Sequence, residues 1–506
     1  MPINFIVNDP NAVTSLPMRT KEPLADRKTG QAGFNFVPSS PAALFSPDTA
    51  DFVFWQSREA ALTALQVWES LNGPLKQWGS QTSNPQKLDL LPDAGDDLNA
   101  YYDRSSLSFF HRTIGAKTFF SGASTDVVSH ESGHAFLDAL RPELFGTNIT
   151  EHGAFHEAFG DCMAVLTALF DEGSRRALLK ASPDLGSPNF AESLCEELSS
   201  AVKLALGANH PAAEPRHALN AFVFQLPTTL PTTGRPQVLT SEIHSFGRIF
   251  VGCFYDVVRN VFMNAPGRDE ASLFSTAQLA GKLLIAGAQQ APLSPRFFQS
   301  VGRAILLADQ TTNGGANEKA VTDAFSRHGI SLGAMSVLTP NATLAGPSPR
   351  MGAVATGAAL APETMKDIKK RIQAQPGSKM VLQRFMLGDQ NVVQATHYRE
   401  VRLDSDSKEL SGVVAYAPEP VLVGSVRQFS AVFNMLPDAS TTEDEVHAFV
   451  GTLLSNNNIA FESKRKSAKP ARAVATRRRD LTKDQTHIIE VRNGKKVLTR
   501  VRYLCR

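Results

Sequence analysis

The chain has 506 residues, which is enough for two or three domains with a sizeable core. Hydrophobic residues make up 42% of it and charged residues 20%, as in ordinary folded proteins, and its net charge of +2 indicates no class of partner by itself. No apolar run approaches the length that crosses a bilayer, so the sequence predicts no membrane span.

The first 50 residues are rich in Pro, Asn, Asp and Ser and show no sustained periodicity, which predicts an extended N-terminal arm over residues 1–50. The residues that follow Met1 form neither a basic n-region nor a long apolar h-region, so no signal peptide is predicted. We therefore expect a cytoplasmic protein, or one exported by a route that reads no such signal.

The first periodic segments come after this arm. An amphipathic pattern over residues 57–72 predicts a helix. Residues 99–103 and 107–111 are predicted to form two strands that pair through a turn.

Residues 126–140 then predict a helix that carries an H-E-x-x-H motif. His130 and His134 stand four residues apart, so both imidazoles leave the same face and can share one tetrahedral zinc ion. Glu131, on a neighbouring face, can reach a water held by that metal. This arrangement is typical of zinc peptidases, and alone it is only moderately specific.

A second helix over residues 153–166 strengthens the interpretation. It is apolar nearly all round, which indicates burial, and Glu157 and Asp161 lie four apart on its charged face. A buried carboxylate needs a cation or a donor. A zinc ion lacking its third ligand would satisfy Glu157, and a zinc-bound histidine that needs orienting would satisfy Asp161.

These two helices resemble the thermolysin-like zinc endopeptidases, whose members carry H-E-x-x-H on one helix and, on the next, a glutamate followed four residues later by an aspartate. The similarity covers roughly residues 50 to 333. It implies an α+β fold in which residues 51–333 form a two-lobed catalytic domain, with a mixed N-terminal lobe and a helical C-terminal lobe. It also implies zinc as the cofactor and peptides or proteins as substrates.

The same resemblance assigns roles to four residues outside the two helices. Asn99 and Ala100 lie in a segment similar to the edge strand that holds the substrate backbone. Arg216 sits where these enzymes place an arginine that binds a substrate carbonyl, and His244 where they carry the transition-state histidine. Ordinary edge-strand chemistry remains an alternative for Asn99.

Three positions near the proposed centre depart from the family. His156 precedes Glu157 where an asparagine is usual, which leaves His156 open as an alternative ligand. Asn148 stands near the place of a missing tyrosine, and Glu242 substitutes for the aspartate that normally partners the transition-state histidine.

A fourth departure concerns calcium. Ala168 stands where a calcium-binding member would carry a glutamate, although Asp126 remains. We therefore expect calcium to be absent from the paired site that is usual in the family.

The rest of the chain predicts a helical end to the catalytic domain and a separate C-terminal part. Apolar helices are expected over residues 246–263, 272–285, 296–307 and 318–325. Residues 334–362, which carry hardly a charge, are predicted to be a linker, and residues 363–506 a small α+β accessory domain. That domain contains a helix at 363–374, strands, a second helix at 441–454 and a final hairpin at 486–503, with a turn at Asn493-Gly494.

A basic loop at residues 464–479 lies within this accessory domain. It lacks the interleaved aromatic residues of a nucleic-acid site, so a solvated loop is favoured over nucleic-acid binding. The four cysteines show no C-x-x-C spacing, which favours reduced thiols that pack as small hydrophobic groups, with one disulfide still open.

The sequence thus predicts a zinc-dependent endopeptidase. Zinc would be bound by His130, His134 and Glu157, with Glu131 as the general base. His244 would donate to the developing oxyanion. The alternative is a metal-binding pseudo-peptidase whose C-terminal domain recruits a partner.

Overall fold

The structure is a computed structural model with mixed helix and strand, compatible with the α+β class that the sequence predicted. It describes residues 1–12, 16–37, 39–333, 355–356, 366, 369–370, 374, 380–387, 390–423, 432–434, 439–461 and 483–506. The predicted linker 334–362, apart from residues 355–356, and the basic loop 464–479 lie outside the described residues, as does most of the predicted helix 363–374.

The N-terminal residues contribute strands as well as an arm. Strands β1 (Ile3–Phe5) and β2 (Arg19–Lys21) pair with each other, and β3 (Gly33–Phe36) pairs in parallel with β4 (Lys87–Leu91). Ile3 is completely buried and Phe34 nearly so. The first 50 residues are therefore partly built into the fold, whereas the sequence predicted an arm over its surface.

Strand β3 lies at one edge of a five-stranded mixed sheet. The sheet order is β3, β4, β6 (Ser106–Phe109), β5 (Ala100–Tyr102) and β19 (Tyr503–Leu504). Strands β5 and β6 are the predicted pair, and they are antiparallel. The opposite edge, β19, comes from the last residues of the sequence, and it pairs with β5 in antiparallel register. Residues some 400 apart in the chain thus meet at this edge.

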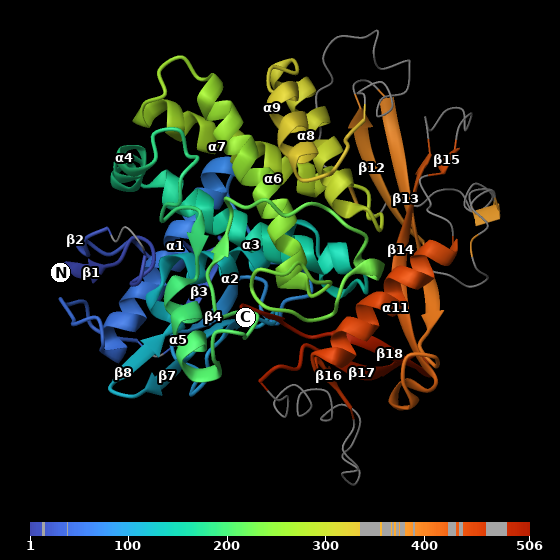
Figure 1. Ribbon diagram of the computed structural model, residues 1–506, viewed down its shortest axis with the longest axis horizontal. Helices are drawn as coiled ribbons and strands as arrows, with labels where there is room; N and C mark the ends of the chain where they lie inside the picture. The colour runs from blue at the N-terminus through green and yellow to red at the C-terminus, as the bar shows by residue number, and fades with distance from the viewer. Residues whose placement is uncertain are drawn as a thin grey trace.

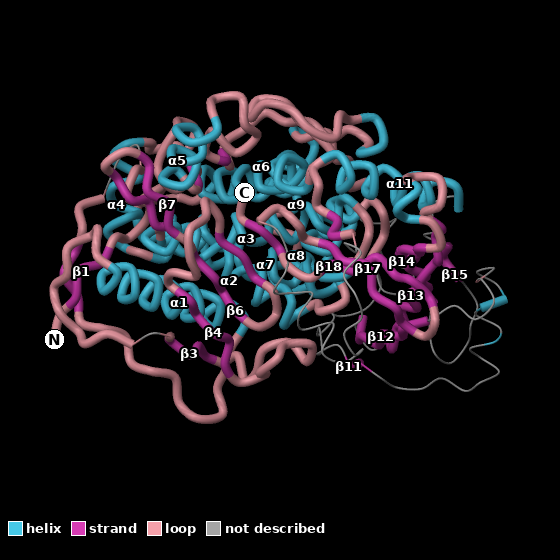
Figure 2. The backbone as a smooth tube through the Cα atoms, turned by 90° about the horizontal axis from the view of Figure 1, so that it is seen from below, coloured by secondary structure: helices cyan, strands magenta, loops and turns pink. Residues whose placement is uncertain are grey.

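Three helices pack beside this sheet. Helix α1 (Ala50–Asn72) is capped by the Thr49 side chain, and its buried residues contact α2 (Thr125–Leu140) and α3 (Thr150–Phe170). The predicted helix at 126–140 is confirmed. In Figure 2 the strands β4 and β6 cross in front of these helices.

Further helices follow the third one in the chain. They are α4 (Glu172–Ala181), α5 (Glu196–Leu206), α6 (Ile243–Asn264), α7 (Glu270–Gln290), α8 (Phe297–Asn313) and α9 (Glu318–Arg327). The predicted apolar helices at residues 246–325 correspond to α6–α9, and these gather at one side of the molecule in Figure 1. Phe155 of α3 packs edge-on against Phe250 of α6, which joins this group to the centre of the molecule.

The C-terminal part forms a second sheet. Its order is β11 (Ala355–Thr356), β12 (Met380–Leu387), β13 (Gln390–Arg402), β14 (Val413–Val423), β18 (Lys495–Arg500), β17 (His487–Arg492) and β16 (Ile459–Ala460), and β15 (Val432–Asn434) also pairs with β14. The final predicted hairpin is confirmed as β17–β18. Helix α11 (Ala439–Ser455) accompanies this sheet, as Figure 1 shows.

From β18 the chain returns to the first sheet. Val501 still donates its amide hydrogen to Thr486 O, and two residues later Tyr503 begins β19. The C-terminus therefore lies in the middle of the view in Figure 1.

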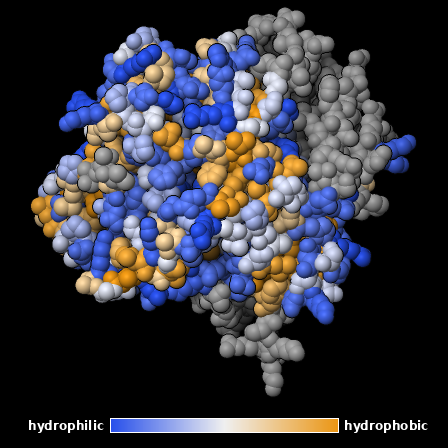
Figure 3. Space-filling model, in the orientation of Figure 1, coloured by the Kyte–Doolittle hydropathy of each residue, from blue (hydrophilic) through white to orange (hydrophobic). Residues whose placement is uncertain are grey.

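Among the described residues, no helix combines the length and the apolarity needed to cross a membrane. The face seen in Figure 3 is mainly a mixture of polar and apolar residues, with apolar ones gathered near its centre.

Candidate active site

Helices α2 and α3 bring the predicted metal ligands together because they approach each other at glycines. A Cβ added to Gly160 would stand 2.7 Å from Nδ1 of His130, and one added to Gly133 would stand 2.8 Å from the Cα of Gly160. Any larger residue would hold the helices apart. The bare backbone at these two points therefore sets the distance between the histidines of α2 and Glu157 of α3.

Ligand atoms of His130, His134 and Glu157 all lie within 4.8 Å of one another. Nε2 of His130 is 3.3 Å from Oε2 of Glu157, and Nε2 of His134 is 3.6 Å from the same atom. Two ligands that each stand about 2.1 Å from a tetrahedral zinc ion lie about 3.4 Å apart, so the spacing fits the ion.

The hydrogen-bonding of these atoms also fits a cation. Both Nε2 atoms and both carboxylate oxygens of Glu157 are buried without a hydrogen-bond partner among the described residues. Oε2 of Glu157 also lies 3.2 Å from Nε2 of His244. Buried polar atoms are almost always paired, so four ligand atoms that converge without hydrogen bonds fit a site for a cation. The three side chains could hold a metal, as the sequence predicted.

Glu131 lies in the same pocket of buried groups. It is fully buried, and neither of its oxygens has a hydrogen-bond partner among the described residues. Burial raises the pKa of Glu131 well above its ordinary value. Its carboxylate lies within 4.8 Å of both a ring nitrogen of His130 and the thiol of Cys505.

Asp161 connects the metal side to the opposite wall. Its Oδ1 is 2.8 Å from Nδ1 of His130, and the guanidinium of Arg216 donates to both of its oxygens. Burial would raise the pKa of Asp161, but Arg216 and His130 outweigh burial and hold it below its usual value. Arg216 also donates from Nη1 to the carbonyl of Cys505 at 2.7 Å.

His156 is placed beside His134 rather than beside the other ligands. Its Nδ1 is 2.8 Å from Nδ1 of His134, the ring nitrogen opposite the one that approaches Glu157. One nitrogen of this pair donates and the other accepts. This geometry suits a role for His156 in orienting His134 better than the role of metal ligand that the sequence left open for it.

His244 lies at the start of α6. Glu242 caps that helix by accepting from the backbone amides of residues 244 and 245, and its carboxylate also contacts Nδ1 of His244 at 2.7 Å. Burial would lower the pKa of His244, but Glu157 and Glu242 raise it to about 9. The protonated ring therefore donates from Nε2 to the carbonyl of Leu504 at 2.6 Å.

Asn99 and Ala100 also contact the end of the chain. The amide of Cys505 donates to Ala100 O at 2.9 Å and lies 3.2 Å from Oδ1 of Asn99. All four residues to which the sequence assigned substrate contacts thus touch Leu504 or Cys505.

Sequence reasoning did not foresee residues 503–505 in the site. Tyr503 stacks on His134 and on His156, with ring centroids 4.9 and 4.1 Å apart. The thiols of Cys195 and Cys505 lie 3.9 Å apart. Their shared hydrogen bond lowers the pKa of Cys505 to about 6 and raises that of Cys195. In the sequence, Tyr503, Leu504 and Cys505 follow Arg500-Val501-Arg502 without a motif that points to the site.

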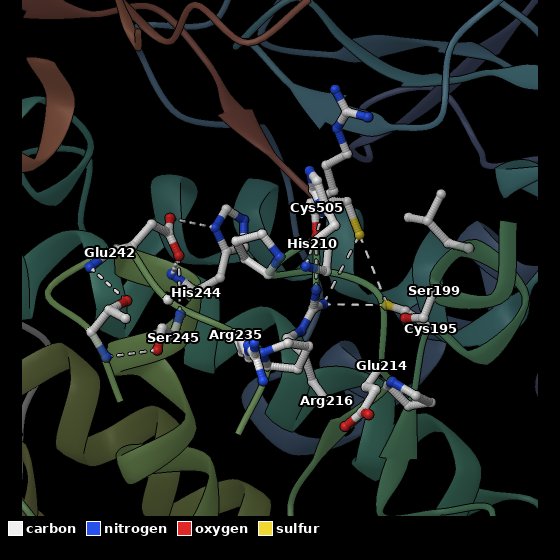
Figure 4. Close-up of a pocket in the computed structure, with 18 of the residues that line it drawn as sticks. Cys195, Ser199, His210, Glu214, Arg216, Arg235, Glu242, His244, Ser245 and Cys505 are labelled. Atoms are coloured by element: carbon white, nitrogen blue, oxygen red, sulfur yellow. Dashed lines mark hydrogen bonds and ion pairs between the residues drawn. The ribbon is translucent and has the colours of Figure 1, made fainter. Parts of the chain in front are cut away.

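A cavity of about 810 Å³ opens beside these groups. Its lining includes residues of the cleft and of the end of the chain: Cys195, Arg216, His244, Leu504, Cys505 and Arg506. Figure 4 shows Cys505 beside Cys195 and Arg216. The candidate metal ligands His130, His134 and Glu157 are buried, with exposed fractions of 2% or less. Leu504, Cys505 and Arg506 line the cavity, and Tyr503 beside them stacks on the candidate ligand His134.

Two further features concern the departures from the family. Asn148 donates to Tyr416 O in β14, not to His244. Asp9, Asp126 and Glu196 form a second buried cluster of carboxylates within 4.8 Å. The absence of calcium from the family's usual paired site stays a prediction.

Comparison with known proteins identifies one family. Residues 226–334 match the family model of the fungalysin metallopeptidases (M36), a thermolysin-like zinc metallopeptidase family. The match includes Glu242 and His244 and spans well under half of the chain, and the H-E-x-x-H motif, which is characteristic of that family, lies upstream of it. No curated protein matches the chain.

This match confirms the resemblance to thermolysin-like zinc metallopeptidases that the sequence indicated. It supports a zinc-using protease, which is a hydrolase, and peptide or protein substrates.

Proposed function

We propose that this chain, which is similar to the fungalysin metallopeptidases over residues 226–334, is a zinc-dependent endopeptidase. The observation that carries the proposal is the convergence of four buried, unpartnered ligand atoms of His130, His134 and Glu157 at the spacing of a zinc site. When bound, zinc supplies a Lewis acid that lowers the pKa of a water and polarises a carbonyl.

The chain's own residues would then move the protons. Glu131 takes a proton from the attacking water and returns it to the leaving amine, and burial, which raises its pKa, makes it a stronger base than an exposed carboxylate. Asp161 holds the ring of His130 through Nδ1, so that Nε2 faces the ion.

The wall of the cleft would hold the peptide. His244 donates from Nε2 to the oxygen of the carbonyl under attack, as it does here to Leu504 O. Arg216 holds the next carbonyl, and Asn99 and Ala100 accept from the amide between them, as they do here with Cys505.

These contacts favour internal peptide bonds. Each one goes to a main-chain amide or carbonyl, which any extended peptide offers, and none requires a free terminus. In this proposal the catalytic domain is two-lobed and spans residues 51–333, residues 334–362 link it to an accessory domain at 363–506, and the metal lies between the mixed lobe and the helical lobe.

The experiment is digestion of a mixed peptide library, with cut sites determined by mass spectrometry. The chain is tested with and without residues 502–506, since Leu504 and Cys505 occupy the contacts that a substrate backbone would use. Cuts within peptides that disappear on chelation and return with zinc are expected. The Glu131→Gln variant serves as the matched control because it should keep zinc and lose cleavage. Zinc-loaded chain that leaves the library intact in both forms would favour the pseudo-peptidase alternative.

A further inference from the structure

The segment Tyr503–Arg506 lies in the cleft as an added strand. Tyr503 and Leu504 pair with Tyr102 and Tyr101 in antiparallel register, which extends the five-stranded sheet by β19. Strand addition at a sheet edge is a common way to bind an extended peptide. Here the peptide is part of the same chain.

Each polar main-chain group at the centre of this segment is paired with a residue of the cleft. Leu504 O accepts from His244, Cys505 N donates to Ala100 O, and Cys505 O accepts from Arg216. These are the residues for which the proposed function needs a peptide. The segment therefore uses the contacts that a substrate would need.

The segment also covers the groups that would react. The Tyr503 ring stacks on His134, and the Cys505 thiol lies within 4.8 Å of a Glu131 oxygen. With the segment in place, His130, His134 and Glu157 are at most 2% exposed. A peptide from solution cannot reach them while residues 503–506 remain where they are.

We propose that Tyr503–Arg506 is an internal ligand of the peptide cleft, a latch that keeps the candidate active site closed until the segment leaves. The roles of His244, Arg216 and Ala100 in this inference rest on the proposed function. The occupancy of the cleft itself rests on the contacts alone.

The second sheet carries the latch. The segment follows β18 directly, and the Arg500 guanidinium at the end of β18 stacks on the Tyr503 ring at 4.3 Å. At the other end Arg506 forms an ion pair with Asp484, which precedes β17. Displacement of the β17–β18 hairpin would therefore withdraw the segment from the cleft.

The first experiment measures binding and needs no catalysis. A fluorescent peptide with the sequence of residues 500–506 is titrated into the full chain and into a chain ended after Val501. The shortened chain should bind the peptide at least about tenfold more tightly, because a site that is rarely free shows a reduced apparent affinity. Equal affinities, or no binding to a shortened chain that still holds one zinc ion, would overturn the latch.

Point variants guard against misfolding of the shortened chain. Cys505→Pro removes the amide that donates to Ala100 and leaves the rest of the chain intact, so it should also bind the peptide. Val491→Ser, at a side chain that is 69% exposed on the same hairpin, is the matched control and should exclude the peptide as the full chain does.

The cysteine pair tests the register. If the peptide takes the place of the segment, its thiol will lie near Cys195, as the thiol of Cys505 does at 3.9 Å. Oxidised dithiothreitol would then take two electrons and two protons from these thiols, forming one disulfide and reduced dithiothreitol. The cross-link should map to Cys195 and vanish in Cys195→Ser. A cross-link to Cys162 or Cys253 in its place would contradict the inference.

Activity then separates the two proposals. Peptide binding without library cleavage by the shortened chain would keep the cleft ligand and reject the endopeptidase. Equal cleavage by the full and shortened chains would keep the endopeptidase and overturn the latch. Loss of residues 505–506 from the full chain on zinc addition, seen as a change of intact mass, would make the segment a substrate and also overturn the latch.

Discussion

The two halves of the candidate site differ in how their polar groups are satisfied. On the metal side, four ligand atoms of His130, His134 and Glu157 face one another with no hydrogen-bond partner among the described residues. On the peptide side, Ala100, Arg216 and His244 are hydrogen-bonded to Leu504 or Cys505. The metal half could hold an ion from solution, whereas the peptide half is already in contact with its own chain.

This difference implies that the two halves should respond to different changes in the protein. The metal half should gain stability when zinc binds, because an ion that binds only the folded state stabilises it. The peptide half should become open to a substrate only when residues 503–506 leave it. The substitutions below test each half in a chain ended after Val501, so that the latch does not mask the effect.

The largest effect is expected for Glu157→Gln. Replacing the carboxylate takes one of three ligands from the ion, so the protein should lose most of its zinc and all measurable cleavage. Zinc content by mass spectrometry and the melting temperature check this. His156→Gln is the matched control because the glutamine amide can still hydrogen-bond Nδ1 of His134, so this variant should keep most of the metal. A zinc-replete Glu157→Gln chain, with zinc lost from His156→Gln, would exchange the roles of the two residues.

Glu131→Gln should lower the rate of cleavage by about 10² to 10⁴, the range of a general base. The side chain contributes nothing to the ligand set, so zinc content and melting temperature should stay close to those of the parent chain. Steady-state kinetics on one peptide from the library gives the rate. Parent-like turnover would remove Glu131 from the mechanism.

His244→Ala tests the peptide side. A donor to the developing oxyanion acts mainly in the transition state, so kcat should fall by about 10² to 10³ with KM little changed. The zinc content should not move. If kcat is preserved and the melting temperature falls, His244 is a packing residue.

Asp161 lies between the two halves, where it contacts His130 and Arg216. Asp161→Asn should therefore moderately weaken both zinc binding and the contacts of Arg216. Loss of the charge that orients His130 should reduce zinc affinity by about 10- to 100-fold. A chelator competition measures the affinity. Unchanged affinity would mean that the Asp161 charge is not needed to orient the ring of His130.

The smallest expected effect is a shift in pH dependence in Glu242→Gln. Glu242 keeps a proton on Nδ1 of His244 and raises the pKa of that ring, so deprotonation removes the Nε2 donor and cleavage should fall as the pH rises through that pKa. Without the Glu242 carboxylate that pKa is lower, and the alkaline limb of the pH profile should move to lower pH. An unmoved limb would assign it to another group.

The sequence predicted the helices of the metal side well, because local spacing determines them. Residues four apart on one helix share a face wherever the helix lies, so the pairs His130 with His134 and Glu157 with Asp161 could be placed before the structure was known. The match to a metallopeptidase family confirms the class of protein that these pairs indicated.

The peptide side could be predicted only in part. The strand at Asn99 was expected from local pattern, but its partner β19 lies some 400 residues away, and no local pattern encodes such a pairing. The same holds for Cys195 and Cys505, which no spacing relates, and for β3, which joins the sheet from a stretch expected to be an arm. Contacts between distant segments depend on the packing of the whole chain.

The pairing of β19 with β5 also bears on solubility. Strand β19 is the last strand of the five-stranded sheet, so its departure would leave the amide and carbonyl groups of β5 without partners at an open edge. Open edges are the surfaces through which sheets of separate molecules join. A chain opened in this way would then be exposed to self-association at the edge of β5, and the closed form would be the one suited to storage at high concentration.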